Sequence, residues 1–233
     1  MNSISEICKQ YSIPLFIDSA CGIGSKYKNN KLGQLGIPGI ISFNGNKTIT
    51  SGSGGIFFSQ NESEIKLVRH LASTAKISRK YDHDMVGFNY KMSNIQAALG
   101  LAQLEQLENI LREKKDIHNL YRKEFSSSNF FNLINSPEWS QSSYWLNFLM
   151  IKNNYIDKSS DLIEFLNDNY IRINYFWKPI HFQDPYLNLM SSESAKKNID
   201  IQQKVIPLPS TATLKQVDQI KVINLINQYF ENI

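Results

Sequence analysis

The sequence contains only two cysteines and no long hydrophobic run. Cys8 and Cys21 are too few for a disulfide-stapled fold, and they do not have the spacing of a metal site. A reduced, cytoplasmic setting is therefore expected. No run of about 18 apolar residues occurs, and the N-terminus lacks the apolar segment of a signal peptide. We therefore expect no membrane partner.

Several motifs that carry chemistry are also missing. The sequence has neither His-Glu-x-x-His nor Cys-x-x-Cys, which excludes common zinc and redox motifs. Gly22 and Gly24 lack the third glycine of a dinucleotide fingerprint. Asn46 separates Gly45 from Lys47, so this stretch is not a Walker motif.

The excess of positive charge is small. The formal net charge is +4, and the basic residues are spread along the chain. The densest run, Arg112, Lys114 and Lys115, falls on a predicted helix and is interpreted as a solvated helix face. We expect no nucleic-acid partner, whereas a basic pocket for a phosphorylated small molecule also fits the composition.

The first half of the chain shows the pattern of an α/β domain. A short helix is expected over 3–11. The apolar run 13–17 ends at Asp18 and predicts a buried parallel strand with polar residues at its carboxyl end. Further strands are expected over 38–44 and 55–59, on either side of a glycine-rich segment that contains Lys47.

The second half of the chain has a different sequence pattern. Ser93 and Gln96 form a capping box, which predicts a long, bent amphipathic helix to about residue 125. We expect two domains, 1–125 and 126–233. For the second, the patterns predict a small α+β fold with the following elements: strands over 144–151 and 171–176, a helix over 160–167, and a final helix opened by a capping box at Thr213–Gln216 with Val217, Ile220, Ile223, Ile226 and Phe230 inward.

Asp18 and Lys47 are the pair of residues that suggests a particular chemistry. Pyridoxal phosphate (PLP) acts as an electron sink when a carboxylate keeps its pyridine nitrogen protonated. A lysine must also bond to its aldehyde and move protons. Taken alone, however, an aspartate after a strand is more often a turn former, and a lysine in a glycine-rich loop is more often solvated.

Several separated motifs together resemble the sugar-nucleotide aminotransferases of the DegT/DnrJ type, and the resemblance covers the whole chain. It is nearest to the branch that makes precursors of bacillosamine and legionaminic acid. The motifs are Phe16–Ala20, Ser42–Thr50, Gly52–Gly55, His70–Lys76, Val86–Gly100, Trp177–His181 and Pro207–Ser210. The resemblance implies the C-terminal part of a PLP fold type I large domain, with a mostly parallel sheet, followed by a small α+β C-terminal domain.

The resemblance also implies roles for individual residues. Lys47 matches the lysine that bonds to PLP, and Asp18 matches the partner of its pyridine nitrogen. The other implied cofactor-binding residues are Ala20, Cys21, Ser42 and Asn89. Cys21 departs from the family, which usually has Gln, Glu or His there, and a thiol is a weaker hydrogen-bond partner. The family supplies Asn89 from a neighbouring subunit, which implies a homodimer.

A further set of residues is expected on the substrate side: Tyr90, Lys91, Trp177, Lys178 and His181. Lys91 stands where the family usually has arginine, so the charge is kept but the bidentate grip is lost. Structural alternatives remain open. Ser42 and Asn89 also suit a strand end and a turn, and Trp177, Lys178 and His181 also suit structural roles.

The reaction implied is transfer of an amino group, from glutamate, to C4 of a UDP-linked 4-keto-6-deoxy-N-acetylhexosamine for a surface polysaccharide such as lipopolysaccharide. Family members have a longer N-terminal part, which is expected to hold the helix that binds the PLP phosphate. Two hypotheses follow. The chain is an aminotransferase completed by a separately encoded N-terminal polypeptide, or it is an inactive truncated remnant.

Overall fold

The computed structural model describes residues 1–189, 192–196 and 198–232, and its contacts divide the chain into two units. The first comprises Met1–Leu111 and Ser136–Trp145, and the second comprises Arg112–Asn135 and Leu146–Ile233. The division falls within the long helix α4 (Leu107–Phe125), not at its end. The two domains 1–125 and 126–233 stay a prediction.

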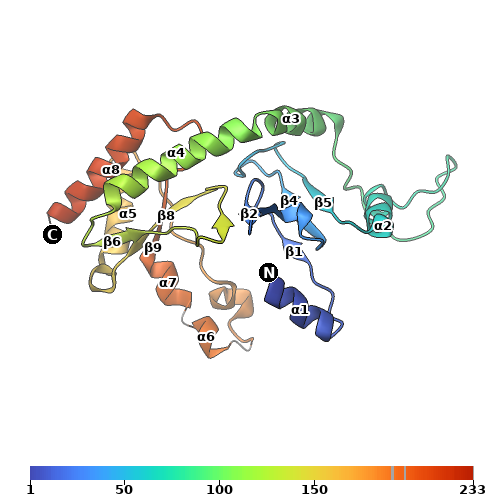
Figure 1. Ribbon diagram of the computed structural model, residues 1–233, viewed down its shortest axis with the longest axis horizontal. Helices are drawn as coiled ribbons and strands as arrows, with labels where there is room; N and C mark the ends of the chain where they lie inside the picture. The colour runs from blue at the N-terminus through green and yellow to red at the C-terminus, as the bar shows by residue number, and fades with distance from the viewer. Residues whose placement is uncertain (190–191, 197, 233) are drawn as a thin grey trace. The chain divides into compact units, whose positions relative to one another are not determined.

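The first unit contains two small sheets (Figure 1). In one, β1 (Ile17–Asp18) runs parallel to β4 (Gly39–Ser42), and β4 runs antiparallel to β5 (Gly55–Phe58). The other is antiparallel and has the order β3 (Asn30–Lys31), β2 (Lys26–Tyr27), β7 (Ser140–Gln141). The helices are α1 (Asn2–Gln10), the 3-10 turn η1 (Leu32–Gln34), α2 (Glu62–Ala72) and α3 (Asn94–Glu105).

The strand predicted over 13–17 is largely wrong. Only Ile17 belongs to β1, and the side chains of Ile13 and Phe16 are 55% and 52% exposed. Within the described residues β1 has one neighbouring strand, β4, so no strand pairs with its other edge. The predicted helix over 3–11 and the strands over 38–44 and 55–59 are confirmed as α1, β4 and β5.

The capping box before α3 is confirmed. Ser93 Oγ accepts the Gln96 N–H, and the Gln96 side chain accepts the Ser93 N–H. The bend predicted in the long helix is a break at Gln106, between α3 and α4. Two leucines of α3, Leu101 and Leu104, are 59% and 47% exposed.

The second unit is built on an antiparallel sheet in the order β6 (Phe131–Leu133), β8 (Asn147–Ile151), β9 (Val205–Leu208). Its other elements are η2 (Asn153–Tyr155), α5 (Lys158–Asp168), η3 (Ile180–Phe182), η4 (Asp184–Tyr186), α6 (Glu193–Lys196), α7 (Asn198–Lys204) and α8 (Gln216–Glu231). The predicted small α+β fold is thereby confirmed. Among the described helices of both units, none is long and apolar enough to cross a membrane.

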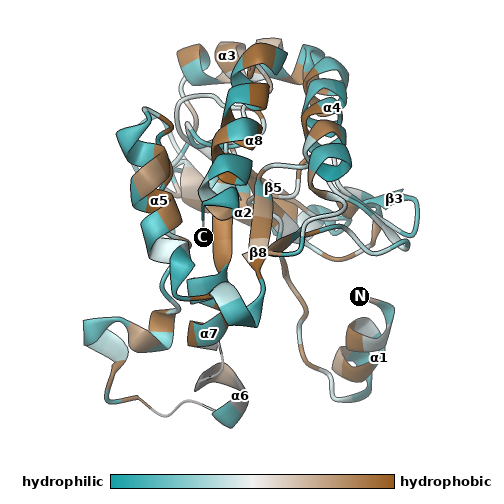
Figure 2. Ribbon diagram, turned by 90° about the vertical axis from the view of Figure 1, so that its left-hand side faces the viewer, coloured by the Kyte–Doolittle hydropathy of each residue, from teal (hydrophilic) through white to brown (hydrophobic). Residues whose placement is uncertain are grey.

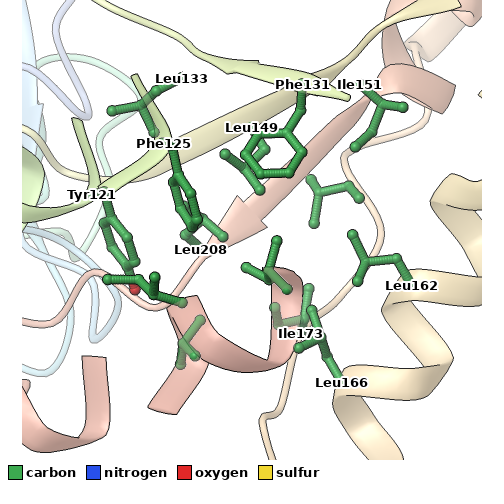
Figure 3. Close-up of a cluster of buried hydrophobic side chains, with 14 of the residues drawn as sticks. Tyr121, Phe125, Phe131, Leu133, Leu149, Ile151, Leu162, Leu166, Ile173 and Leu208 are labelled. Atoms are coloured by element: carbon green, nitrogen blue, oxygen red, sulfur yellow. The ribbon is translucent and has the colours of Figure 1, made fainter. Parts of the chain in front are cut away.

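Hydrophobic side chains from the sheet and from α4, α5 and α8 form the core of the second unit (Figure 3). Tyr121, Leu149, Leu162 and Ile226 are fully buried there. Alternate residues of β8 are buried, and the apolar run from Phe148 to Ile151 gives the strand its hydrophobic colour in Figure 2. The alternation of buried and half-buried residues along β8 therefore reflects one buried face of the sheet.

Two predictions for the second unit are wrong. Residues 171–176 form no strand, because the side chain of Asn167 bonds both the N–H and the carbonyl of Ile173 in place of a neighbouring strand. The final helix starts at Gln216 rather than after Thr213, following a turn in which Leu214 N–H donates to Thr211 O. Of its expected inward residues, Val217 and Ile220 are exposed, whereas Ile223, Ile226 and Phe230 are buried.

Candidate active site

Asp18 and Ser42 lie at the same edge of the first sheet. Asp18 ends β1, Ser42 ends β4, and the two strands run parallel with Asp18 opposite Ile40. The carboxyl ends of adjacent parallel strands are the usual ligand-binding edge of an α/β sheet. The sequence pattern placed Asp18 after the end of a strand, whereas the structure places it as the last residue of β1. Ser42 was expected only from the resemblance.

Asp18 has one carboxylate oxygen engaged locally and one available. Its Oδ1 accepts the Ala20 N–H at 2.9 Å, which is the turn-forming interaction expected for an aspartate after a strand. Its second oxygen makes no hydrogen bond to the residues that the structure describes. The carboxylate is exposed, so this oxygen can still accept a proton donor from a ligand.

Lys47 is held by a tight turn whose base is buried. Lys47 N–H donates to Asn44 O at 3.0 Å, and the next two residues, Thr48 and Ile49, are buried. Trp145 Nε1 donates to Asn46 O at 2.6 Å, which attaches the turn to a residue 99 positions later in the chain. The backbone at Lys47 is thus fixed, while its side chain remains half-buried.

The amine of Lys47 contacts two side chains. Its Nζ lies 3.1 Å from Cys21 Sγ and 4.4 Å from the centre of the Trp145 ring. The structure therefore brings together Cys21 and Lys47, two of the residues predicted to bind the cofactor. Trp145 was missed as a site residue, because it is 99 residues from Asn46 and was assigned to the strand predicted over 144–151. A cation over the face of an indole ring is attracted to it.

Two buried hydroxyl groups, on the residues that directly follow Asp18 and Lys47 in the sequence, lack hydrogen-bond partners in the described part of the chain. Ser19 Oγ and Thr48 Oγ1 have no hydrogen bond within the described residues. Ser42 Oγ accepts the Asn44 N–H at 3.3 Å, which is the hydrogen bond of a strand-end hydroxyl to the backbone. The hydroxyl proton of Ser42 remains available to a ligand. Buried polar atoms without partners are rare and indicate a missing polar group.

This set of groups fits PLP. The edge offers a carboxylate oxygen for a ring nitrogen, an amine for an aldehyde, and hydroxyls for phosphate oxygens. When bound, PLP supplies an electron sink for carbon–nitrogen chemistry.

Asn89 lies in the loop that follows α2. It is exposed, and its backbone forms an isolated antiparallel bridge with Ser73. Tyr90 and Lys91 are exposed as well, and the Tyr90 ring stacks on Phe88 with centroids 5.1 Å apart. All three side chains are accessible to a ligand or a second subunit.

The other predicted substrate-side residues belong to the second unit. Trp177 is 57% exposed, and Lys178 is exposed beside it. His181 lies within η3, and the centre of its ring is 4.4 Å from that of Phe182. Its Nε2 is buried and has no hydrogen-bond partner in the described part of the chain. The unpaired nitrogen favours a ligand-binding role for His181 over a structural one.

Comparison with known proteins identifies a family. Residues 1–227 match the DegT/DnrJ/EryC1/StrS aminotransferase family. The chain is 32% identical to EpsN of Bacillus subtilis, a candidate pyridoxal phosphate-dependent aminotransferase, over 100% of its own length and 61% of that protein. It is 32% identical to GDP-perosamine synthase of Vibrio cholerae over 99% and 63% of the two chains.

A further relative is the UDP-4-amino-4,6-dideoxy-N-acetyl-beta-L-altrosamine transaminase of Campylobacter jejuni (strain 81-176), which is 30% identical over 95% of this chain and 60% of its own. The fold matches PseC of Helicobacter pylori, an aminotransferase in pseudaminic acid biosynthesis, with a TM-score of 0.91 at 23% identity, over 100% and 63% of the chains. The chain thus spans about three fifths of the length of the relatives it matches.

Proposed function

The chain belongs to the DegT/DnrJ/EryC1/StrS aminotransferase family, and we propose that it provides the lysine and aspartate of a PLP-dependent transaminase acting on a nucleotide-linked sugar. The observation that carries the proposal is the single sheet edge at which Asp18 ends its strand and Lys47 meets Cys21. Asp18 holds a proton at the ring nitrogen of the cofactor. Lys47 accepts and returns protons at the reacting carbon.

The substrate of the proposal is the C4 keto group of a nucleotide-linked 4-keto-6-deoxy sugar, with glutamate as the amino donor. Relatives support this choice, since one is a transaminase named for a 4-amino-4,6-dideoxy sugar and another is a GDP-perosamine synthase. Tyr90, Lys91, Trp177, Lys178 and His181 are the proposed substrate-side residues. Ser42 binds the cofactor phosphate, and Asn89 does so from the second subunit of a homodimer.

A half-enzyme that needs a complementary polypeptide is the second candidate. The matched relatives are longer, and one edge of β1 has no neighbouring strand in the described residues. Close to it in sequence, Ile4, Ile7 and Phe16 are at least half exposed. Exposed apolar side chains beside an open sheet edge are typical of a surface that another segment covers.

The test is a titration of the purified chain with PLP, followed by borohydride reduction and mass spectrometry. The proposal predicts a new absorbance band and a stoichiometric reduced adduct on Lys47. Lys47→Ala should remove both, whereas Lys31→Ala, at an exposed position in the same unit, should keep both. A band that persists in Lys47→Ala would show that the lysine assignment is wrong.

The same titration separates the two candidates. If the chain alone gives no band, it is repeated with the part of EpsN that the match leaves uncovered, produced as a separate polypeptide. A band that appears only in the mixture supports the half-enzyme. No band in either sample supports the inactive remnant. Amino transfer from glutamate to a UDP- or GDP-linked 4-keto-6-deoxy sugar is then measured with whichever preparation binds PLP.

A further inference from the structure

The segment that carries Asn89 is held by backbone pairing with the end of α2. Phe88 N–H donates to Leu71 O at 2.7 Å, and Tyr90 N–H donates to Ala72 O at 2.9 Å. These two bonds lie on either side of Asn89. They fix its backbone although its side chain is exposed.

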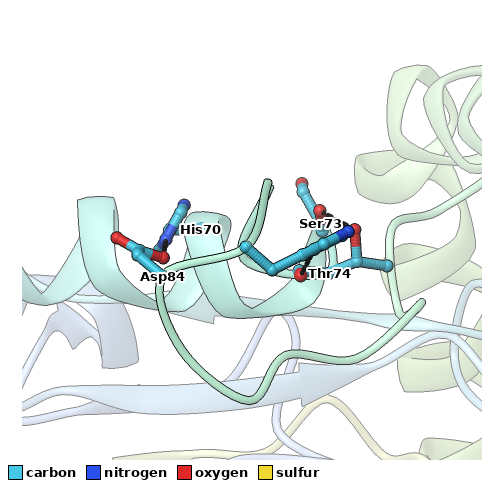
Figure 4. Close-up of polar contacts among 5 residues, drawn as sticks. His70, Ser73, Thr74 and Asp84 are labelled. Carbon is cyan, nitrogen blue, oxygen red and sulfur yellow. Dashed lines mark hydrogen bonds and ion pairs between the residues drawn. The ribbon is translucent and has the colours of Figure 1, made fainter. Parts of the chain in front are cut away.

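Two histidines close the loop that joins these paired segments. His70 Nε2 lies 2.6 Å from Asp84 Oδ1 (Figure 4). His83 Nδ1 lies 2.7 Å from Thr74 O. The hydrogen bond from His70 lowers the pKa of Asp84, so the carboxylate form is the one that the contact favours. Asp84 N–H also donates to Ala75 O, which ties the same stretch to its start.

The loop is packed from within and presents its large side chains outward. Ala75 is fully buried at its centre, whereas Val86 and Tyr90 are 83% and 77% exposed. In the view of Figure 1 the loop extends beyond α2. A surface ion pair as exposed as His70 and Asp84 contributes little to global stability, so its effect is expected to be local.

We propose that His70 and Asp84 are a positioning pair, which closes the loop so that Asn89 is presented in one fixed geometry to the cofactor phosphate of a second subunit. This inference rests on the proposed function. Holding the loop before binding removes the entropic cost of ordering it when the phosphate arrives. Neither residue touches the cofactor in this scheme.

The first readout is amide hydrogen exchange, which needs no cofactor. His70→Ala and Asp84→Ala should each lower the protection of the Phe88 and Tyr90 amides by about fivefold. The double variant should lose no more than either single one, because both remove the same contact. Asp82→Ala, which removes the 2.6 Å bond to Ser78 in the same loop, is the matched control and should leave both amides protected. The Ile41 and Leu149 amides report that each unit remains folded.

The second readout is the PLP affinity of the same variants, in the preparation that binds PLP. His70→Ala and Asp84→Ala should weaken it by about fivefold, and Asp82→Ala should not change it. Unchanged exchange at Phe88 and Tyr90 would overturn the positioning role. Faster exchange with unchanged PLP affinity would overturn the link to the phosphate while leaving Lys47 as proposed. Failure of every preparation to bind PLP would instead overturn the proposed function, and the phosphate link with it, and the exchange data would still decide whether the pair holds the loop.

Discussion

At the scale of single residues, the candidate site depends on short-range geometry that a side chain of the wrong size would disturb. Lys47 keeps its position because the turn from Asn44 is bonded at its base and capped by Trp145. The loop that carries Asn89 depends in the same way on a residue with no side chain, Gly87. In both places, backbone fit decides where a functional group lies.

Substitution of Gly87 by alanine should open the Asn89 loop. A Cβ at Gly87 would lie 2.4 Å from the carbonyl carbon of Thr74 and 2.5 Å from the backbone nitrogen of Ala75, so the backbone must move. We expect a loss of about 1–3 kcal/mol in local stability, seen as faster amide exchange at Phe88. Gly45→Ala is the control, because a Cβ there meets nothing within 4 Å. Equal exchange in both variants would contradict the prediction.

At the scale of elements, the sequence predicted those whose local pattern and packing agree. α3 starts at the predicted capping box because the Ser93 side chain caps the helix. Burial alternates along β8 because one face of the strand is covered. The failures occur where a side chain outside the segment bonds its backbone. Asn167 bonds the backbone that would have formed a strand at Ile173, and no periodic pattern records that bond.

The residues of the candidate site also fall into those that local sequence motifs predict and those that they do not. Asp18 and Lys47 could be found from the sequence because each belongs to a local motif, a strand end and a glycine-rich turn. Trp145 could not, because its contact with Lys47 joins an irregular stretch to that turn. The pairing of His70 with Asp84 across a 14-residue separation also lacks a pattern, since neither residue belongs to a motif that predicts the other.

The antiparallel sheet of the second unit should be most sensitive at the centre of β8. Leu149 is fully buried and belongs to β8, the strand between β6 and β9. Leu149→Ala leaves a cavity and should cost about 2.5–5 kcal/mol in the free energy of unfolding. Met150→Ala, on the other face of the same strand, should cost about 1 kcal/mol or less. Urea unfolding followed by circular dichroism measures both. Similar losses would mean that β8 has no dominant buried face.

At the scale of the whole molecule, buried titratable groups make stability depend on alkaline pH. Lys114 on α4 is buried and donates to Ser210 O at 2.6 Å, and burial lowers its pKa from 10.5 to about 8. Tyr121, about two turns further along α4, is fully buried, and burial raises its pKa. Both groups are therefore favoured in their neutral forms by the folded chain.

The two groups act with opposite signs on stability as pH rises. Between the folded and unfolded pKa values of Lys114, about 8 and 10.5, the unfolded chain binds more protons, so the free energy of unfolding rises with pH by up to roughly 3 kcal/mol. Above the unfolded pKa of tyrosine, 10.0, the unfolded chain releases the Tyr121 proton more readily, and stability is lost. We therefore expect unfolding free energy to increase from pH 8 to about pH 10 and then to fall.

Lys114→Met should remove the rising part of this profile. The variant has no group at that position that binds a proton on unfolding, although it also leaves Ser210 O without its donor. Lys115→Met is the matched control, because Lys115 is exposed on the next position of the same helix, and it should keep the wild-type rise. Denaturant unfolding at pH 7.5, 8.5 and 9.5 (roughly the window that the shift defines) measures the slope. A rise that survives in Lys114→Met would assign it to other groups and would remove the link between this buried lysine and alkaline stability.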